Sequence, residues 1–173
     1  MNDEEIEKKL FEVYSEDVKN NYTEHLIDQY KIYIESAEKI SDRRLETNKF
    51  FLTLNTAVIG LFGFIEAKNP GQITFVLTLG SFVGVIISYY WFRIIESYKG
   101  LNTGKFKVVH MIEKRLPLSL YETEWEVLGQ GKDNKKYRPF THIEVKIPIL
   151  FVAVYLVIFI ASIPWGTIIS CFK

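Results

Sequence analysis

Three long stretches of the chain are apolar and free of charge, and they set the fold. Residues 50–65 carry no charged side chain over 16 positions, residues 69–92 none over 24, and residues 147–172 none over 26. A helix needs roughly 20 mostly apolar residues to cross the hydrocarbon core of a bilayer. The second and third stretches reach this length alone, and the first reaches it with its flanks. The pattern predicts three membrane-spanning helices.

A soluble fold is the alternative to membrane insertion. A helix buried in a large soluble core can also be apolar all round, but the remaining residues are mostly charged helix formers, too few to enclose three such helices. The chain is 48% hydrophobic and 24% charged, with the apolar residues in blocks. The first stretch is no cleaved signal peptide, because it begins near residue 50 behind a long charged segment. We therefore predict an all-α integral membrane protein.

Basic residues predict the orientation of the three spans. Lys and Arg are frequent before the first span and between the second and third, whereas the other side holds only Lys68, beside the turn signal Pro70-Gly71, and Lys173. Basic residues concentrate in short loops on the cytoplasmic side. The amino terminus and the middle segment are predicted inside, and the hairpin tip and carboxyl terminus outside.

The segments outside the spans are predicted to be helical as well. An Asn-Asp-Glu-Glu cap opens a helix over residues 2–20, and a helix from about residue 22 runs unbroken into the first span. The second span continues inward until Pro117 ends it, followed by a short helix at 119–128 and a polar loop at 129–136. The organisation is cytoplasmic N-terminal helices (1–48), a transmembrane helical hairpin (49–95), a cytoplasmic helical segment (96–146) and a third transmembrane helix (147–173). The amino-terminal half of the second helix carries an apolar stripe of Leu26, Tyr30, Tyr33, Ala37 and Ile40.

Small residues recur every fourth position in the second span, at Gly80, Gly84 and Ser88. Small side chains let helix backbones approach closely where lipid gives no hydrophobic drive for association. The stripe predicts either a contact between subunits or packing within one chain against the first or third span.

Polar residues also fall on one line of the first span, at Asn48, Asn55 and Glu66. Around a symmetric ring of subunits this stripe could line a pore, with Phe62 as an apolar constriction and Arg43 and Arg44 at the inner mouth. Alternatively, Asn55 bonds a neighbouring helix, and Glu66 sits among lipid headgroups. We favour the second interpretation.

The sequence offers no convincing catalytic centre, and we expect no enzyme. His110 and Glu113 share a helical face with Asn102 nearby, as polar candidates outside the membrane, but one His/Glu pair cannot hold a catalytic metal. No cofactor motif is visible. The net charge of zero argues against nucleic acid as a partner. The single cysteine, Cys171, excludes a disulfide within one chain.

Three extended motifs of polar, aromatic and apolar residues stand out along the chain. The first is Tyr30-Lys-Ile-Tyr33 followed by Ile40-Ser-Asp-Arg43-Arg44-xxx-Asn48-xx-Phe51-xxx-Asn55; the second is Trp91-Phe-Arg93-Ile-Ile-xx-Tyr98-xx-Leu101-Asn102-xxx-Phe106-xxx-His110-xx-Glu113-xx-Leu116-Pro117; the third is Thr141-His142-Ile143-Glu144-xxx-Pro148. Together they cover about residues 22–165 and resemble, in the same order, motifs of the RipA family of small octameric bacterial membrane proteins. The resemblance implies a multi-pass protein of the bacterial inner membrane that assembles as a homo-octamer, and it implies no reaction.

A weaker similarity is to the two-span SLATT-type membrane proteins of bacterial conflict systems, which act as pore-forming effectors. The expected function is a structural, scaffolding or interaction role, with the lipid bilayer, other copies of the chain and a cytoplasmic protein as partners. The alternative is an oligomeric channel or regulated pore-forming effector. An enzyme or transporter is the weakest option, because no inverted repeat and no membrane-embedded charge pair is visible.

Overall fold

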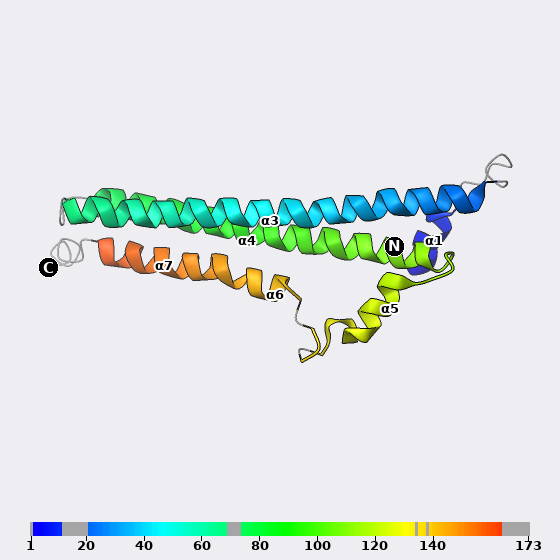
Figure 1. The fold of residues 1–173 in the computed structure, drawn as a ribbon. Helices are drawn as coiled ribbons and strands as arrows, with labels where there is room; N and C mark the ends of the chain where they lie inside the picture. Colours follow the sequence, from blue (N-terminus) through cyan, green and yellow to red (C-terminus); the bar gives the residue numbers. More distant parts are fainter. Residues whose placement is uncertain (1, 12–20, 69–73, 134, 138, 164–173) are drawn as a thin grey trace. The chain divides into compact units, whose positions relative to one another are not determined.

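A computed structural model describes residues 2–11, 21–68, 74–133, 135–137 and 139–163 of the chain. Within these ranges all regular structure is helical, as the sequence predicts (Figure 1). The elements are α1 (Asp3–Leu10), α3 (Tyr22–Lys68), α4 (Thr74–Glu113), α5 (Leu120–Val127), the 3-10 turn η1 (Gly129–Gly131), α6 (Thr141–Glu144) and α7 (Lys146–Ser162).

Among the described residues, three helical segments are long and apolar enough to cross a membrane, and they confirm the predicted three-span membrane fold. They are Tyr22–Lys68, Thr74–Glu113 and Thr141–Ser162. The first two contain 47 and 40 residues, about twice what one crossing needs. The predicted continuation of both helices beyond the apolar stretches is therefore confirmed. The helix α4 also runs through Gly100 and Gly104 and ends before Pro117.

The chain divides into two compact units. We call Arg43–Lys99 with Pro139–Lys173 the membrane unit, because it holds the three apolar stretches, and Met1–Asp42 with Gly100–Arg138 the extension unit. Both α3 and α4 contribute to each unit.

The core of the membrane unit is aromatic where its three helices meet. Trp91 is 1% exposed and stacks on Phe51, with ring centroids 5.8 Å apart. The ring of Phe151 in α7 also lies near Trp91, with ring centroids 6.0 Å apart. The outer surface is apolar too, with large side chains such as Phe64, Phe75 and Val157 exposed. Such a surface is typical of helices that face lipid rather than water.

The extension unit buries the predicted apolar stripe of α3. Leu26, Ala37 and Ile40 are buried, as are Val109 and Ile112 of α4. The cap of α1 is also confirmed, because Asn2 and Glu5 exchange side chain to backbone hydrogen bonds. The helix α1 ends at Leu10, well short of residue 20. Residues 12–20, the turn at Pro70-Gly71, and Cys171 lie outside the described residues.

Candidate functional site

Three groups of polar contacts join the helices of the membrane unit, around Asn48, Asn55 and the Thr78–Ser162 pair, and we call them together the polar chain. Asn55 belongs to the middle group. This side chain is 1% exposed. Its Nδ2 donates to the carbonyl oxygen of Phe51 at 2.8 Å, and its Oδ1 accepts from the Ser88 hydroxyl at 3.1 Å. The Tyr155 hydroxyl donates to the Asn55 carbonyl oxygen at 3.4 Å. One residue of α3 is thereby linked to both α4 and α7.

A second amide, Asn48, joins the same three helical segments nearer Arg44. Its Oδ1 accepts from the Trp91 indole at 2.9 Å, and its Nδ2 donates to Glu144 Oε1 at 3.2 Å. The other Glu144 oxygen lies 3.7 Å from Arg44 Nε. Both side chains of this ion pair are largely shielded, with 19% and 14% exposure. Both the oxygen and the nitrogen of the Asn48 amide thus have hydrogen-bond partners within the same chain.

At the other end of the membrane unit, Thr78 and Ser162 share a hydrogen bond of 2.8 Å between their hydroxyls. Ser81 is fully buried and donates to the Leu77 carbonyl oxygen at 2.6 Å. Polar groups at membrane depth need internal partners because lipid supplies none. The hydroxyl of Thr78 therefore bonds to α7, and that of Ser81 bonds to the backbone of its own helix.

The small residues of α4 lie against aromatic rings of the same chain. A Cβ atom added at Gly80 would overlap the ring of Phe62, and one added at Gly84 would overlap the ring of Tyr155. Ser88, the third small residue, bonds Asn55. In the described structure this stripe therefore packs within one chain, which is one of the two alternatives from the sequence.

The remaining candidates of the first span are placed differently. Phe62 is 7% exposed and belongs to the core of the membrane unit. Arg43 is exposed, and its carbonyl oxygen accepts from Thr47 at 2.8 Å. Glu66 is half-buried near the end of α3. The structure thus gathers Arg44, Asn48 and Asn55 into the polar chain and leaves Arg43 on the surface.

In the extension unit, Glu113 is fully buried and acts as the cap of α5. Its Oε1 accepts from the Tyr30 hydroxyl at 2.8 Å and from the Tyr121 backbone N–H at 3.0 Å, and its Oε2 accepts from the Glu122 N–H at 3.1 Å. Ser119, the residue before α5, gives no side-chain cap. The carboxylate accepts hydrogen bonds from N–H groups that have no partner within the helix at its start. Its negative charge also interacts favourably with the positive end of the helix dipole.

The pKa of Tyr30 is raised by this arrangement. Burial raises the pKa of its hydroxyl well above the usual range, and the hydrogen bond to Glu113 raises it further. The ionised form of Tyr30 would lose its donated hydrogen bond and face a carboxylate, so the neutral form is favoured. Glu113 was expected from the sequence as a polar candidate, but its role in capping α5 was not.

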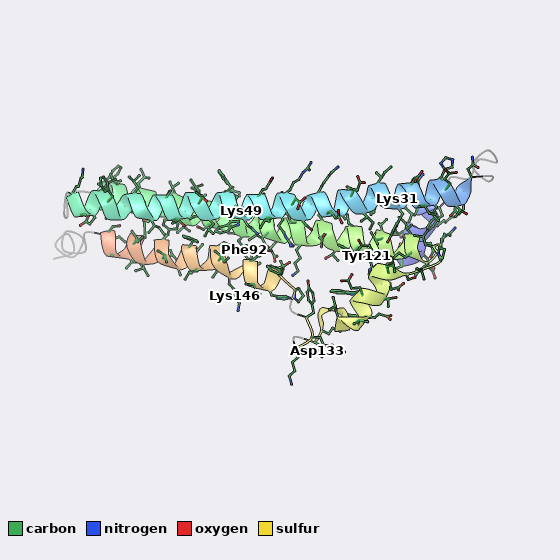
Figure 2. The ribbon with its side chains drawn as sticks, viewed as in Figure 1. Lys31, Lys49, Phe92, Tyr121, Asp133 and Lys146 are labelled. Carbon is green, nitrogen blue, oxygen red and sulfur yellow. The ribbon has the colours of Figure 1, made fainter. Side chains whose placement is uncertain are left out.

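Asn102 and His110 line a groove of about 680 Å³ in the extension unit. Phe, Tyr and Trp side chains from α4, α5 and the following loop contribute to its wall, among them Tyr121, whose position on α5 is labelled in Figure 2. Glu113 is not part of the groove. The three polar candidates are therefore divided, with two in the groove and one under α5. The aromatic walls could not be predicted from the sequence, because Phe106 and Tyr137 are separated by 31 positions.

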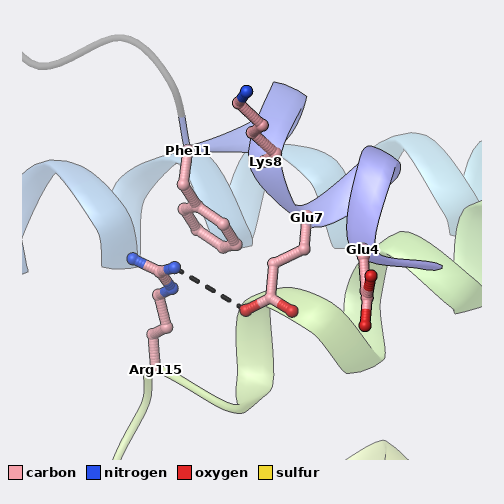
Figure 3. A pocket seen from close by; sticks show the side chains of 5 residues that line it. All are labelled: Glu4, Glu7, Lys8, Phe11 and Arg115. Atoms are coloured by element: carbon pink, nitrogen blue, oxygen red, sulfur yellow. Dashed lines mark ion pairs between the residues drawn. The ribbon is translucent and has the colours of Figure 1, made fainter.

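Charged side chains join the short helix α1 to Lys107 of α4 and to Arg115 just after α4, and we call these contacts the clasp. Arg115 lies 3.7 Å from Glu7, and its guanidinium covers the ring of Phe11 at 3.6 Å (Figure 3). Lys107 forms an ion pair with Asp3, which holds the pKa of that carboxyl below its usual range. Sequence reasoning missed this clasp, since surface charges of this kind carry no distinctive spacing.

A comparison with protein families decides the classification. The model of the Octameric membrane protein family (8xMP) matches residues 27–164. The chain belongs to the octameric membrane protein family. No curated protein and no solved structure matches it.

The match to the octameric membrane protein family includes the whole polar chain, from Arg44 to Ser162, together with Glu113 and the groove. It excludes α1 and therefore one side of the clasp. Among the described residues, no three His, Cys, Asp or Glu side chains are grouped to hold a metal ion.

Proposed function

We propose that the protein is one subunit of a homo-octamer that acts as a structural scaffold in the bacterial inner membrane and presents its extension unit to a cytoplasmic protein. Membership of the octameric membrane protein family supports the assembly. As a finer part of this proposal, we assign the protein to the RipA family. Catalysis is not part of it.

One observation carries the scaffold role: the polar side chains of the spans bond to each other within a single chain. Asn48, Asn55 and Thr78 each pair with a residue of another helical segment. Hydrogen bonds between helices stabilise their packing in lipid. A protomer whose polar groups are already paired is suited to rigid anchoring, with an apolar outer surface left for lipid or for other subunits.

The channel alternative from the sequence stays a prediction with less support. It needs Asn55 and Phe62 at a surface that faces a central axis, and both are buried within the protomer. Of the other candidates, Arg43 is exposed, and Arg44, Asn48 and Glu66 are half-buried.

Conductance across a planar bilayer distinguishes the two roles. We expect the reconstituted full-length octamer to give no single-channel openings, because its polar groups pair internally. Thr56→Leu, a change at an exposed neighbour of Asn55, is the control for Asn55→Leu. Ohmic openings that Asn55→Leu alters and Thr56→Leu leaves unchanged would overturn the scaffold proposal.

We also propose that the extension unit is cytoplasmic, on the basis of the Lys and Arg distribution. Lys132 and Lys68 are both exposed, and each can be changed to cysteine in a Cys171→Ser background. In intact spheroplasts, a membrane-impermeant maleimide should label the Lys68→Cys variant and spare the Lys132→Cys variant. The reverse labelling would invert the topology.

A further inference from the structure

The groove of the extension unit has aromatic walls arranged as two pairs. Phe106 and Tyr121 meet edge to face, with ring centroids 5.7 Å apart, and Trp125 and Tyr137 do so at 6.4 Å. Leu128 adds to the apolar lining. The faces of such rings carry negative partial charge and attract cations. The walls therefore suit a ligand with an apolar body and a positive charge.

Two acceptors of the groove have no donor or cation paired with them among the described residues. The Oδ1 atom of Asn102 is buried and has no hydrogen-bond partner. Glu124 contributes a carboxylate that no cation of the described residues pairs with. A buried acceptor without a partner is costly, so it points to a missing donor.

The one permanently cationic side chain in the lining is already engaged. Lys107 forms its ion pair with Asp3 of α1, which balances its positive charge. The other polar groups are His110, the hydroxyls of Thr103, Tyr121 and Tyr137, and the indole N–H of Trp125, and none of them carries a permanent charge. The unmatched charge in the groove is consequently the negative charge of Glu124, and an anion would be repelled by it.

We propose that this groove binds an organic ammonium ion with an apolar body. The ammonium N–H groups donate to Asn102 Oδ1 and to the Glu124 carboxylate. The apolar body packs between the rings of Phe106, Tyr121, Trp125 and Tyr137. Nothing in the octameric assembly or in the scaffold role requires such a site, so the two proposals stand or fall separately.

Phenethylammonium is a suitable probe, and 2-phenylethanol is its neutral counterpart. Full-length protein in nanodiscs of zwitterionic phosphatidylcholine is titrated calorimetrically, with empty nanodiscs subtracted. We expect saturable binding of phenethylammonium, and at least about tenfold weaker binding of 2-phenylethanol, because the charged hydrogen bonds are lost. Trp125 fluorescence should change on binding, and Trp125→Phe should remove that change.

Glu124→Gln and Asn102→Leu test the two acceptors. Each should weaken binding about tenfold, whereas Glu126→Gln, an exposed carboxylate on the same helix outside the groove, should leave it unchanged. The absence of saturable binding would overturn the proposal, as would equal affinity for the neutral alcohol. Wild-type affinity in Glu124→Gln would also overturn it and would leave a neighbouring subunit as the better occupant of the groove.

Discussion

At the scale of single residues, Asn55 shows how a polar side chain is kept inside a membrane protein. Its side-chain amide accepts from Ser88 and donates to the Phe51 carbonyl oxygen, and its backbone carbonyl oxygen accepts from Tyr155. Hydrogen bonds between membrane helices contribute about 0.6 kcal/mol on average and up to about 1.7 kcal/mol. Asn55 is therefore expected to fix the register of three helices more than to supply most of their stability.

A double-mutant cycle measures this contact. Asn55→Leu and Ser88→Ala should each destabilise the protein in detergent titration, with a coupling energy of about 0.5–1.7 kcal/mol because one hydrogen bond joins them. Thr56→Ala paired with Ser88→Ala is the control and should show no coupling. Additive effects of Asn55→Leu and Ser88→Ala would contradict the contact.

Gly84 gives a steric prediction. In Gly84→Ala the new methyl group overlaps the Tyr155 ring, and overpacking of this kind costs about 1–3 kcal/mol. Gly63→Ala is the matched control, since nothing lies within 4 Å of its added Cβ atom. Thermal unfolding should show a lower Tm for Gly84→Ala and an unchanged or slightly higher Tm for Gly63→Ala. Equal Tm values would show that α7 does not pack on Gly84.

These residues could be predicted from the sequence by type, but their partners could not. Polar and small side chains inside apolar runs are conspicuous, so Asn55 and Gly84 were candidates. Ser88 and Tyr155, however, come from other helices 33 and 100 positions from Asn55. Only the packing of three helices in space determines which of them meet.

At the scale of elements, α5 depends on a residue outside itself. It has eight residues, fewer than an isolated helix needs in water, and Glu113 supplies the cap that Ser119 does not. The apolar periodicity of residues 119–128 predicted the helix, and Pro117 predicted the break before it. The cap was not predictable, because it requires the chain to reverse between α4 and α5.

Removing the cap should loosen α5 selectively. Glu113→Ala leaves two backbone N–H groups and the Tyr30 hydroxyl without an acceptor, a loss of about 2–4 kcal/mol. Hydrogen exchange of residues 120–127 should rise strongly, and exchange in α7 should not. Glu126→Ala, at an exposed position of the same helix, should behave like wild type. Unchanged protection in Glu113→Ala would contradict the capping role.

Tyr30 gives the pH dependence of the same contact. Its pKa is raised in the folded state, whereas in the unfolded chain it returns to about 10. The folded state therefore keeps a proton that the unfolded state loses, and the stability present below about pH 10 decreases as the pH rises above it. Tyr30→Phe should show a smaller loss of stability between about pH 9.5 and 11 by chemical denaturation. An identical slope in both proteins would contradict the buried hydrogen bond.

At the scale of the whole molecule, the surface of the three spans is suited to contact with lipid and with other subunits. The three spans expose large apolar side chains, including Phe64, Phe82 and Leu150, while their polar groups are paired inside the protomer. Hydropathy alone predicted the lipid-facing surface, because blocks of apolar residues this long are poorly soluble in water. The number of subunits could not be predicted from spacing, and it comes from family membership.

The central claim is that each protomer crosses the membrane three times and pairs its polar groups internally within an octamer. Electron microscopy of the detergent-solubilised full-length protein tests it most directly. We expect a closed ring of eight copies, with Asn55 inside the helical bundle of each protomer. A single compact chain that stays in solution without detergent, or a ring with Asn55 lining an open axis, would contradict this account.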